Sequence, residues 1–403
     1  MIEQWLECLV CAARYDIAPM LQGCPRCARA GRKGAIEVRY SYDSIRSLSE
    51  PDMPGLWKWR PLLPAIRPEA VTSLHEGSTP LVPLDLASGS TRVFVKNETM
   101  NPTWAHKDRP NVVTISMARH FGYRNIVAVS TGNHGNSAAA YSAAGGLGCV
   151  VFCNANAPRE QTRLMRHYGA RVFVGGESDK LAAGLMRRGG WFPSLTLCPR
   201  GGFASPFAIE GFKTIAFEIF EQLGGRVPDR VFVPASSGDG LYGIAKGFRE
   251  LVATGHAGRI PRMVACQTVR ANFYVRAFRE GSRTLKPVSP VETVALSIGD
   301  EIGGLPALWT IYETGGEALE SSEEAILAAA RDYARLGLAL EPASSAALAC
   351  ARAHSDFGRV EETWVLIGTG TAIRWPQTFQ HDTGEALRLP SGFDNIDEIL
   401  PPG

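Results

Sequence analysis

From about residue 111 onward, short apolar runs alternate with longer segments in which apolar residues recur every three or four positions. Runs of strand length, NIVAVS (125–130) and CVVFC (149–153), follow the helix-like segments NVVTISMARHFG (111–122) and GNSAAAYSAAGG (135–146). Strand-sized apolar runs that alternate with amphipathic helices are typical of βαβ units and a parallel sheet. The pattern therefore predicts an α/β fold.

The same alternation returns in the second half of the chain. Before it begins, the segment at 49–70 (SEPDMPGLWKWRPLLPAIRPEA) contains too many prolines for a long helix, so an irregular connector is expected there. The sequence contains no internal repeat. The further predicted elements are helices at 159–169, 207–224, 240–255, 321–337 and 342–354, and strands at 171–175, 230–236, 262–268 and 364–367.

The length and charge of the chain limit the kinds of protein it can be. Its 403 residues, 45% of them hydrophobic, are enough for two or more domains with substantial cores. A formal net charge of +2 gives no argument for nucleic acid or an anionic membrane as partner. No apolar run is long enough to span a bilayer, and residues 1–16 do not resemble a signal peptide. We expect a cytoplasmic protein that binds neither nucleic acid nor membrane.

Four of the nine cysteines lie within the first 27 residues, where Cys8 pairs with Cys11 and Cys24 with Cys27 in two CxxC motifs. Two such motifs can place four thiolates around one tetrahedral Zn²⁺, and four cysteine ligands leave no open position for catalysis. A redox CxxC motif and four unrelated thiols are the alternatives, but a redox motif does not need a second copy. The pattern favours a structural zinc ribbon in residues 1–40.

Three loops at predicted strand ends carry candidate chemistry, because open α/β sheets bind ligands beyond the carboxyl ends of their strands. The first loop reads STGNH (130–134) and leads into a helix. Hydroxyls, a carboxamide and backbone N–H groups at a helix N-terminus suit a carboxylate or phenolate oxygen. Taken alone, this loop is an ordinary capping turn.

The second loop, PASSGDGL (234–241), has the composition of a phosphate site. It leads into a helix and therefore exposes successive N–H groups at the helix N-terminus. The G-K-[ST] continuation of a Walker A motif is absent, and so is the GxGxxG dinucleotide fingerprint. A phosphate without a nucleotide is the better interpretation. The expected phosphate contacts are Ser236, Ser237, Gly238, Asp239 and Gly240.

Thr369 and Lys107 complete the candidate set. Thr369 follows the last predicted strand, where its hydroxyl can meet the edge of a heterocycle, although an ordinary Gly/Thr turn explains the same residues. Lys107 precedes a helix; a solvated loop is the plain interpretation, and an amine with a lowered pKa that attacks a carbonyl is the chemical one. A reactive lysine, a phosphate loop, an asparagine loop and a terminal hydroxyl together are what pyridoxal 5′-phosphate requires.

The ordered motifs resemble the threonine synthase branch of the fold-type II pyridoxal-phosphate enzymes over nearly the whole chain. The family's G-E-G-x-T-P-L reads HEGSTPL at 75–81, and its N-P-T-G-S-F-K-D-R reads NPTWAHKDR at 101–109. S-T-G-N is intact at 130–133. The family's remaining motifs are matched at 206–219, at 341–346 and from Thr369-Gly370 through Pro376.

The resemblance implies two open α/β domains with pyridoxal phosphate between them, and an N-terminal cysteine knuckle pair is common in the family. Residues 110–200 would form the smaller domain, and 41–109 with 201–403 the larger one. Relatives are usually dimers, so a homodimer that acts on a small amino acid is expected.

The resemblance also assigns roles within the site. Lys107 is the Schiff-base lysine and the base for the α-proton, Asn133 contacts the cofactor O3′, and Thr369 faces the pyridine nitrogen. A hydroxyl does not keep that nitrogen protonated as a carboxylate would, which suits elimination and replacement at Cβ or Cγ better than transamination. The expected substrate contacts are Ser130, Thr131, Gly132 and His134.

The chain departs from the family where the substrate phosphate is held. Relatives read N-P-x-R-x-E-G, whereas this chain has Ser205 and Ala208 in place of the asparagine and the arginine. Losing one charge-assisted contact typically costs about 1.5–3 kcal/mol. The three arginines of one helix-like segment are either a substitute clamp or a solvated face. They are Arg159, Arg163 and Arg166.

Beside the reactive lysine, Trp104 replaces a glycine of the family motif, and we expect it to reshape the pocket. His106 and His134 are histidines that the motifs lack. Each is either an added acid or base that titrates near neutral pH or a hydrogen-bonded histidine without catalytic role.

Two classes of function follow. The first is a pyridoxal-phosphate enzyme for elimination or replacement on an amino acid: threonine synthase itself, acting on O-phosphohomoserine, or a relative redirected to another substrate, such as a serine or threonine dehydratase. The second is a catalytically retired zinc-ribbon binding protein. Lys107, Asn133 and the phosphate loop argue against the second class, because drift would be expected to erase them together.

Overall fold

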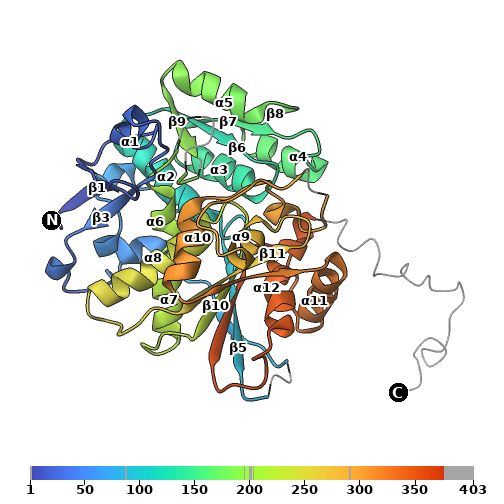
Figure 1. The fold of residues 1–403 in the computed structure, drawn as a ribbon. Helices are drawn as coiled ribbons and strands as arrows, with labels where there is room; N and C mark the ends of the chain where they lie inside the picture. The colour runs from blue at the N-terminus through green and yellow to red at the C-terminus, as the bar shows by residue number, and fades with distance from the viewer. Residues whose placement is uncertain are drawn as a thin grey trace, which may run out of the picture.

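Three sheets and the helices around them organise the chain (Figure 1), which confirms the predicted α/β fold. The description rests on a computed structural model and covers residues 2–86, 89–194, 196–198, 202, 204–289 and 292–375. Pro376, at the end of the last motif, lies outside the described residues. Within them, no helix combines the length and the apolar character needed to cross a membrane.

A parallel four-stranded sheet carries the first run of βα units, in the strand order β8-β7-β6-β9. The strands are β6 (Asn125–Val129), β7 (Gly148–Cys153), β8 (Arg171–Val174) and β9 (Trp191–Ser194). The helices of this region are α2 (Asp108–His120), α3 (Asn133–Ala144), α4 (Arg159–His167) and α5 (Ser178–Arg187).

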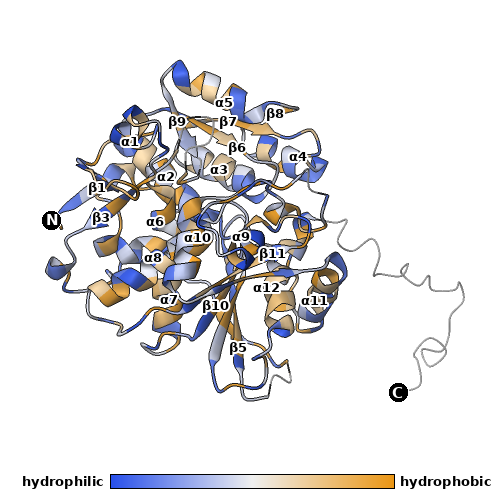
Figure 2. Cartoon of the chain, viewed as in Figure 1, coloured by the Kyte–Doolittle hydropathy of each residue, from blue (hydrophilic) through white to orange (hydrophobic). Residues whose placement is uncertain are grey.

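A six-stranded sheet, in the order β12-β11-β10-β13-β5-β4, forms the second layer and is parallel except at β4. Its strands are β4 (Leu81–Pro83), β5 (Arg92–Asn97), β10 (Arg230–Pro234), β11 (Arg262–Thr268), β12 (Glu317–Ser321) and β13 (Thr363–Gly368). The helices are α6 (Ala208–Phe212), α7 (Thr214–Gln222), α8 (Asp239–Ala253), α9 (Phe273–Arg279), α10 (Leu305–Glu313), α11 (Glu323–Arg335) and α12 (Pro342–Ala353). Every residue of β13 is buried, as its apolar run predicts. Hydrophobic and hydrophilic residues alternate along the helices and strands (Figure 2).

The N-terminal segment is a small antiparallel sheet of β1 (Gln4–Cys8), β2 (Arg14–Tyr15) and β3 (Ile36–Tyr40), with α1 (Pro25–Arg29) between β2 and β3. Strand β3 is hydrogen-bonded to the larger layer. The Tyr40 hydroxyl donates to Glu210 of α6 at 2.5 Å, and Tyr242 of α8 donates to Glu37 at 2.8 Å. The connector contains short 3₁₀ turns at 55–62 and 68–70 and no long helix, as its prolines predict.

The sequence pattern differs from the structure in a few places. The helix expected at 207–224 is divided at Lys213 into α6 and α7, and the Thr214 hydroxyl bonds back to the carbonyl of Gly211 at 2.7 Å. Strands β5, β9 and β12 were not predicted, because each mixes polar residues or a proline into a short run. The domain boundaries at residues 40, 109 and 200 stay predictions.

A buried charge cluster fixes the start of α2. The Arg109 guanidinium donates to both oxygens of Glu98 at 2.6 and 2.8 Å and to both oxygens of Glu218 at 2.8 Å. Lys96 donates to Glu218 at 2.6 Å. All four side chains are at most 1% exposed, and the bidentate geometry compensates the cost of removing their charges from water.

The closest approach of α6 to α2 requires a glycine at position 211. A Cβ built on Gly211 would lie 1.9 Å from the carbonyl oxygen of Arg109. We expect Gly211→Ala to lower the free energy of unfolding by about 3 kcal/mol or more, at the upper end of overpacking costs. Gly184→Ala is the matched control, because this α5 glycine has nothing within 4 Å of the added Cβ. The control should be neutral or slightly stabilising in urea unfolding. Equal midpoints for the two variants would contradict the contact.

Candidate active site

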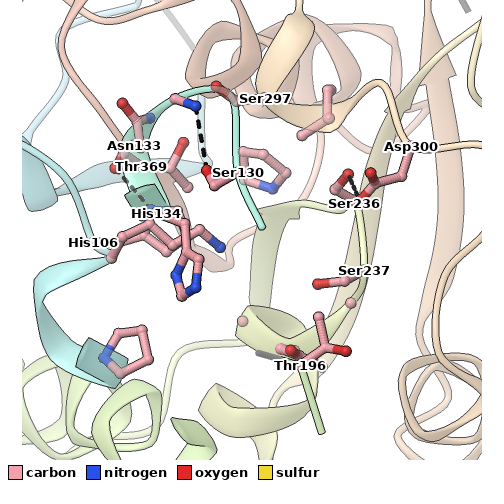
Figure 3. A pocket seen from close by; sticks show the side chains of 18 of the residues that line it. His106, Ser130, Asn133, His134, Thr196, Ser236, Ser237, Ser297, Asp300 and Thr369 are labelled. Atoms are coloured by element: carbon pink, nitrogen blue, oxygen red, sulfur yellow. Dashed lines mark hydrogen bonds between the residues drawn. The ribbon is translucent and has the colours of Figure 1, made fainter. Parts of the chain in front are cut away.

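A cavity of about 380 Å³ opens where the loops after β6, β10 and β13 meet the start of α2 (Figure 3). Every cofactor and substrate residue predicted from the sequence lines this cavity, although the residues come from four separate segments. They are Lys107, Ser130, Thr131, Gly132, Asn133, His134, Ser236, Ser237, Gly238, Asp239, Gly240 and Thr369. Their individual roles stay predictions.

Lys107 immediately precedes α2 and is half-buried, with its Nζ 5.1 Å from the centre of the Phe212 ring. Burial lowers the pKa of the Lys107 amine, and the nearby carboxylates of Asp239, Asp300 and Glu341 partly offset this effect. The amine is therefore neutral more often than an exposed lysine, as a nucleophile or base requires.

The loop before α8 is held in a shape that only glycine allows at its centre. Gly238 has φ +87°, and an added Cβ would lie 2.3 Å from the Tyr274 hydroxyl. The carbonyl of Ser237 accepts hydrogen bonds from the Gly304 N–H at 2.8 Å and from the Tyr274 hydroxyl at 3.0 Å. These contacts hold the loop, whose residues 236–240 line the cavity where α8 begins, a suitable arrangement for a phosphate.

The loop before α3 presents a second helix N-terminus to the same cavity. The Gly132 N–H donates to the Ser130 hydroxyl at 3.2 Å, which fixes the turn. The side chain of Asn133 is 4% exposed and donates from Nδ2 to both oxygens of Glu341 at 3.0 Å. From the end of β13, the Thr369 hydroxyl lies 2.9 Å from that of Ser344.

The two histidines of the cavity are both hydrogen-bonded to backbone carbonyls. His106 Nδ1 lies 2.8 Å from the carbonyl oxygen of Thr369, and His134 Nε2 lies 2.8 Å from that of Ser194. Burial, together with the charge of Lys107, lowers the pKa of His134 to about 4 and that of His106 well below its ordinary value. Of the two alternatives, these contacts and the lowered pKa values favour a hydrogen-bonded histidine over an acid or base that titrates near neutral pH, and the role of each histidine stays a prediction.

The structure shows where the residues that depart from the family motifs, and the three arginines of α4, lie relative to the cavity. Ala208 lines the cavity, whereas Trp104 is not among its lining residues, so the expectation that Trp104 reshapes the pocket stays a prediction and would have to act indirectly. Trp104 instead occupies a left-handed turn with φ +58°, where glycine is the usual residue, and is 45% exposed. The three arginines of α4 are exposed and do not line the cavity, which agrees with a solvated face. They are Arg159, Arg163 and Arg166.

Asp300 is the main cavity residue that sequence reasoning missed. Its carboxylate accepts a hydrogen bond from the Ser236 hydroxyl at 2.7 Å, on the side of the cavity opposite His106 and His134 (Figure 3). Ser297 lines the cavity from the same loop. This loop has no regular pattern, and only the glycines beside Asp300 signalled a turn. No arginine is among the described residues that line the cavity.

Comparisons with known proteins agree with this geometry. The family described as "Pyridoxal-phosphate dependent enzyme" matches residues 72–370. The processed form of threonine deaminase isoform 2 from Solanum lycopersicum has the same fold, with a TM-score of 0.64 and 20% identity over 80% of this chain and 92% of that one. The chain therefore belongs to the pyridoxal-phosphate-dependent enzymes.

Two relatives that match this chain over nearly its whole length show to which family of pyridoxal-phosphate-dependent enzymes it belongs. The chain is 34% identical to a threonine synthase of Methanosarcina acetivorans and 32% identical to one of Methanocaldococcus jannaschii, with 98% of each chain covered in both cases. Within the pyridoxal-phosphate-dependent enzymes, the chain belongs to the threonine synthase family.

The depressed pKa of His134 predicts how stability depends on pH. Between about pH 6.5 and pH 4 the unfolded chain takes up a proton at this residue that the folded chain does not, so His134 lowers stability as the pH falls through this window. We expect His134→Gln to make the acid-side loss of stability shallower. The imidazole resonances of His134 should stay unchanged between about pH 7.5 and 5.5, with a histidine-containing peptide as reference. A shift of the His134 signals near pH 6.5 would contradict the lowered pKa of His134.

Proposed function

We propose that this enzyme catalyses elimination or replacement at the β- or γ-carbon of an amino acid, with Lys107 as its central residue. The observation that carries the proposal is the single cavity that collects the Lys107 amine, two helix N-termini and the Thr369 hydroxyl. Pyridoxal phosphate, when bound, supplies the aldehyde and the electron sink of this chemistry.

Each part of the cavity has a task in this proposal. The N–H groups of 236–240 hold the cofactor phosphate at the N-terminus of α8, and those of 130–134 hold the substrate carboxylate at the N-terminus of α3. The partly neutral amine of Lys107 moves the proton at the α-carbon. His106 and His134 are neutral at pH 7, so their expected task is to donate or accept hydrogen bonds rather than to carry charge.

The composition of the cavity favours a leaving group other than phosphate. Ala208 stands where the family pattern has an arginine, and among the described residues that line the cavity the charged side chains besides Lys107 are carboxylates. They are Glu177, Asp179, Asp239 and Asp300. A second phosphate would meet repulsion in this environment. We therefore propose a threonine synthase-like enzyme that has been redirected to another substrate. The leaving group on the β- or γ-carbon of that substrate would be neutral or weakly charged.

O-phosphohomoserine is the second candidate substrate, because two relatives that match over 98% of their length are named threonine synthase. Steady-state release of inorganic phosphate from O-phosphohomoserine separates the two candidates. We expect little release by the native enzyme and turnover of serine, threonine or their O-acyl derivatives. Lys107→Ala should abolish every turnover. Phosphate release matched by threonine formation would make the enzyme a threonine synthase and contradict the redirected substrate.

The same assay on the variant Ala208→Arg tests whether a missing positive charge limits turnover of O-phosphohomoserine. If the missing charge-assisted contact limits the enzyme, Ala208→Arg should raise kcat/KM for O-phosphohomoserine about 10- to 100-fold. Ala208→Gln is the control, since it adds similar bulk without charge. An equal gain in both variants would show that charge at this position is irrelevant.

We also propose that the cysteine cluster, Cys8, Cys11, Cys24 and Cys27, binds one structural Zn²⁺. The four Sγ atoms lie within 4.8 Å of one another, with Cys8–Cys27 at 3.7 Å and Cys11–Cys24 at 3.6 Å. Tetrahedral coordination with Zn–S bonds of about 2.3 Å places sulfur atoms about 3.8 Å apart, which the observed spacing fits. With four thiolates around it, the ion would stabilise the N-terminal segment and take no part in catalysis.

Metal analysis tests the zinc proposal. We expect about one Zn²⁺ per chain and a loss of zinc together with lower thermal stability in Cys27→Ser. Cys149→Ser, outside the cluster, is the control and should keep its zinc. Zinc-free protein with unchanged unfolding would overturn the proposal. The homodimer and the cytoplasmic location also remain part of the proposed function, on the basis of the family resemblance and the composition.

A further inference from the structure

Behind the loop that precedes α3, a buried arginine contacts the side chain of Asn133. Arg374 is 7% exposed, and its Nη2 donates to Asn133 Oδ1 at 2.7 Å. On its other side, Asn133 Nδ2 donates to the carboxylate of Glu341, which is 1% exposed. The amide of Asn133 is therefore held between a group that can only donate and a group that accepts.

This arrangement determines which way the amide faces. A guanidinium has five N–H donors and no acceptor, so the atom of Asn133 that faces Arg374 must be the oxygen. The nitrogen must then face the opposite direction, toward Glu341 and the cavity. One of its two N–H bonds is used by Glu341, and the other is left to donate to a ligand. In the flipped orientation, the amide oxygen would instead face the carboxylate.

Neighbouring residues constrain the position of Arg374, although its Nε and Nη1 have no hydrogen-bond partner among the described residues. Its guanidinium lies 5.9 Å from the centre of the Trp104 ring, and the Gln161 side chain donates to its carbonyl oxygen at 3.0 Å. The N–H of Thr371, three residues earlier, donates to the carbonyl oxygen of Trp104 at 3.2 Å. Trp104, which departs from the family motif, thus lies against the arginine rather than in the cavity. A cation–π contact between its ring and the guanidinium of Arg374 helps to hold the arginine.

We propose that Arg374 is a positioning residue that orients the Asn133 amide so that its N–H faces the phenolate oxygen of pyridoxal phosphate. The proposal rests on the role of Asn133 as a cofactor contact in the proposed function. Arg374 acts through Asn133 and does not line the cavity itself. Without it, the Glu341 carboxylate alone would orient the amide, so the flipped orientation would be populated more often and the donor to the cofactor would be lost part of the time.

A double-mutant comparison tests this role without relying on turnover. The readouts are the dissociation constant of pyridoxal phosphate, from an absorbance titration, and the pH dependence of the visible absorbance of the holoenzyme. We expect Arg374→Met to weaken cofactor binding about tenfold, as the loss of one well-oriented hydrogen bond implies, and to shift the pH midpoint of the visible band upward because the phenolate loses a donor. Arg374→Lys keeps a charged donor and should restore most of the binding and the spectrum.

The Asn133→Ala background separates positioning from general stability. There, Arg374→Met should change the dissociation constant less than about twofold, because the side chain it orients is gone. A tenfold effect that persists in this background would show a purely structural role and overturn the proposal, as would an unchanged spectrum in the single variant. If the native protein forms no visible band that Lys107→Ala removes, the proposed function fails and the inference fails with it. A native band that is insensitive to Arg374 overturns the inference alone.

Discussion

The bidentate contacts of Arg109 are the interaction on which the site depends. This guanidinium joins Glu98 to Glu218 of α7, so the segment 98–109, which carries Lys107, and the distant helix α7 share one buried cluster. Because a buried charge without its partner costs several kcal/mol, the segments are held in one arrangement. Lys107 lies two residues before Arg109, so the backbone that carries it is held in the same arrangement. The position of the Lys107 amine thus depends on a charge network whose residues are not among those that line the cavity.

Around that fixed lysine, the cavity is assembled from parts that each satisfy a different physical demand. Helix N-termini offer unpaired N–H groups to anions, and glycines at positions 132 and 238 allow the backbone to come close to its neighbours. Burial, in turn, moves the pKa of the Lys107 amine downward and keeps both histidines neutral. The same desolvation therefore favours the neutral form of the lysine and of both histidines.

The departures from the threonine synthase pattern have separate consequences. Ala208 lies in the cavity and removes a positive charge from it, so it bears on the substrate. Trp104 lies outside the cavity, in a left-handed turn beside Arg374, so it bears on the support of the site. The motif comparison treats both as changes next to the active residues. Only their positions in space show that one changes the contents of the cavity and the other its surroundings.

The sequence by itself determined the fold class, the predicted cofactor and twelve of the residues that line the cavity, because strand-end loops and helix N-termini are local features with readable residue patterns. It also placed the four cysteines together, since CxxC spacing is local. The tertiary structure decided what depends on contacts between distant segments. The pKa values of the histidines, Asp300 opposite them, the Arg374–Asn133–Glu341 contact and the exposed face of α4 all belong to this group. Burial and pairing arise only when separate segments meet, and a linear pattern carries no record of which segments those are.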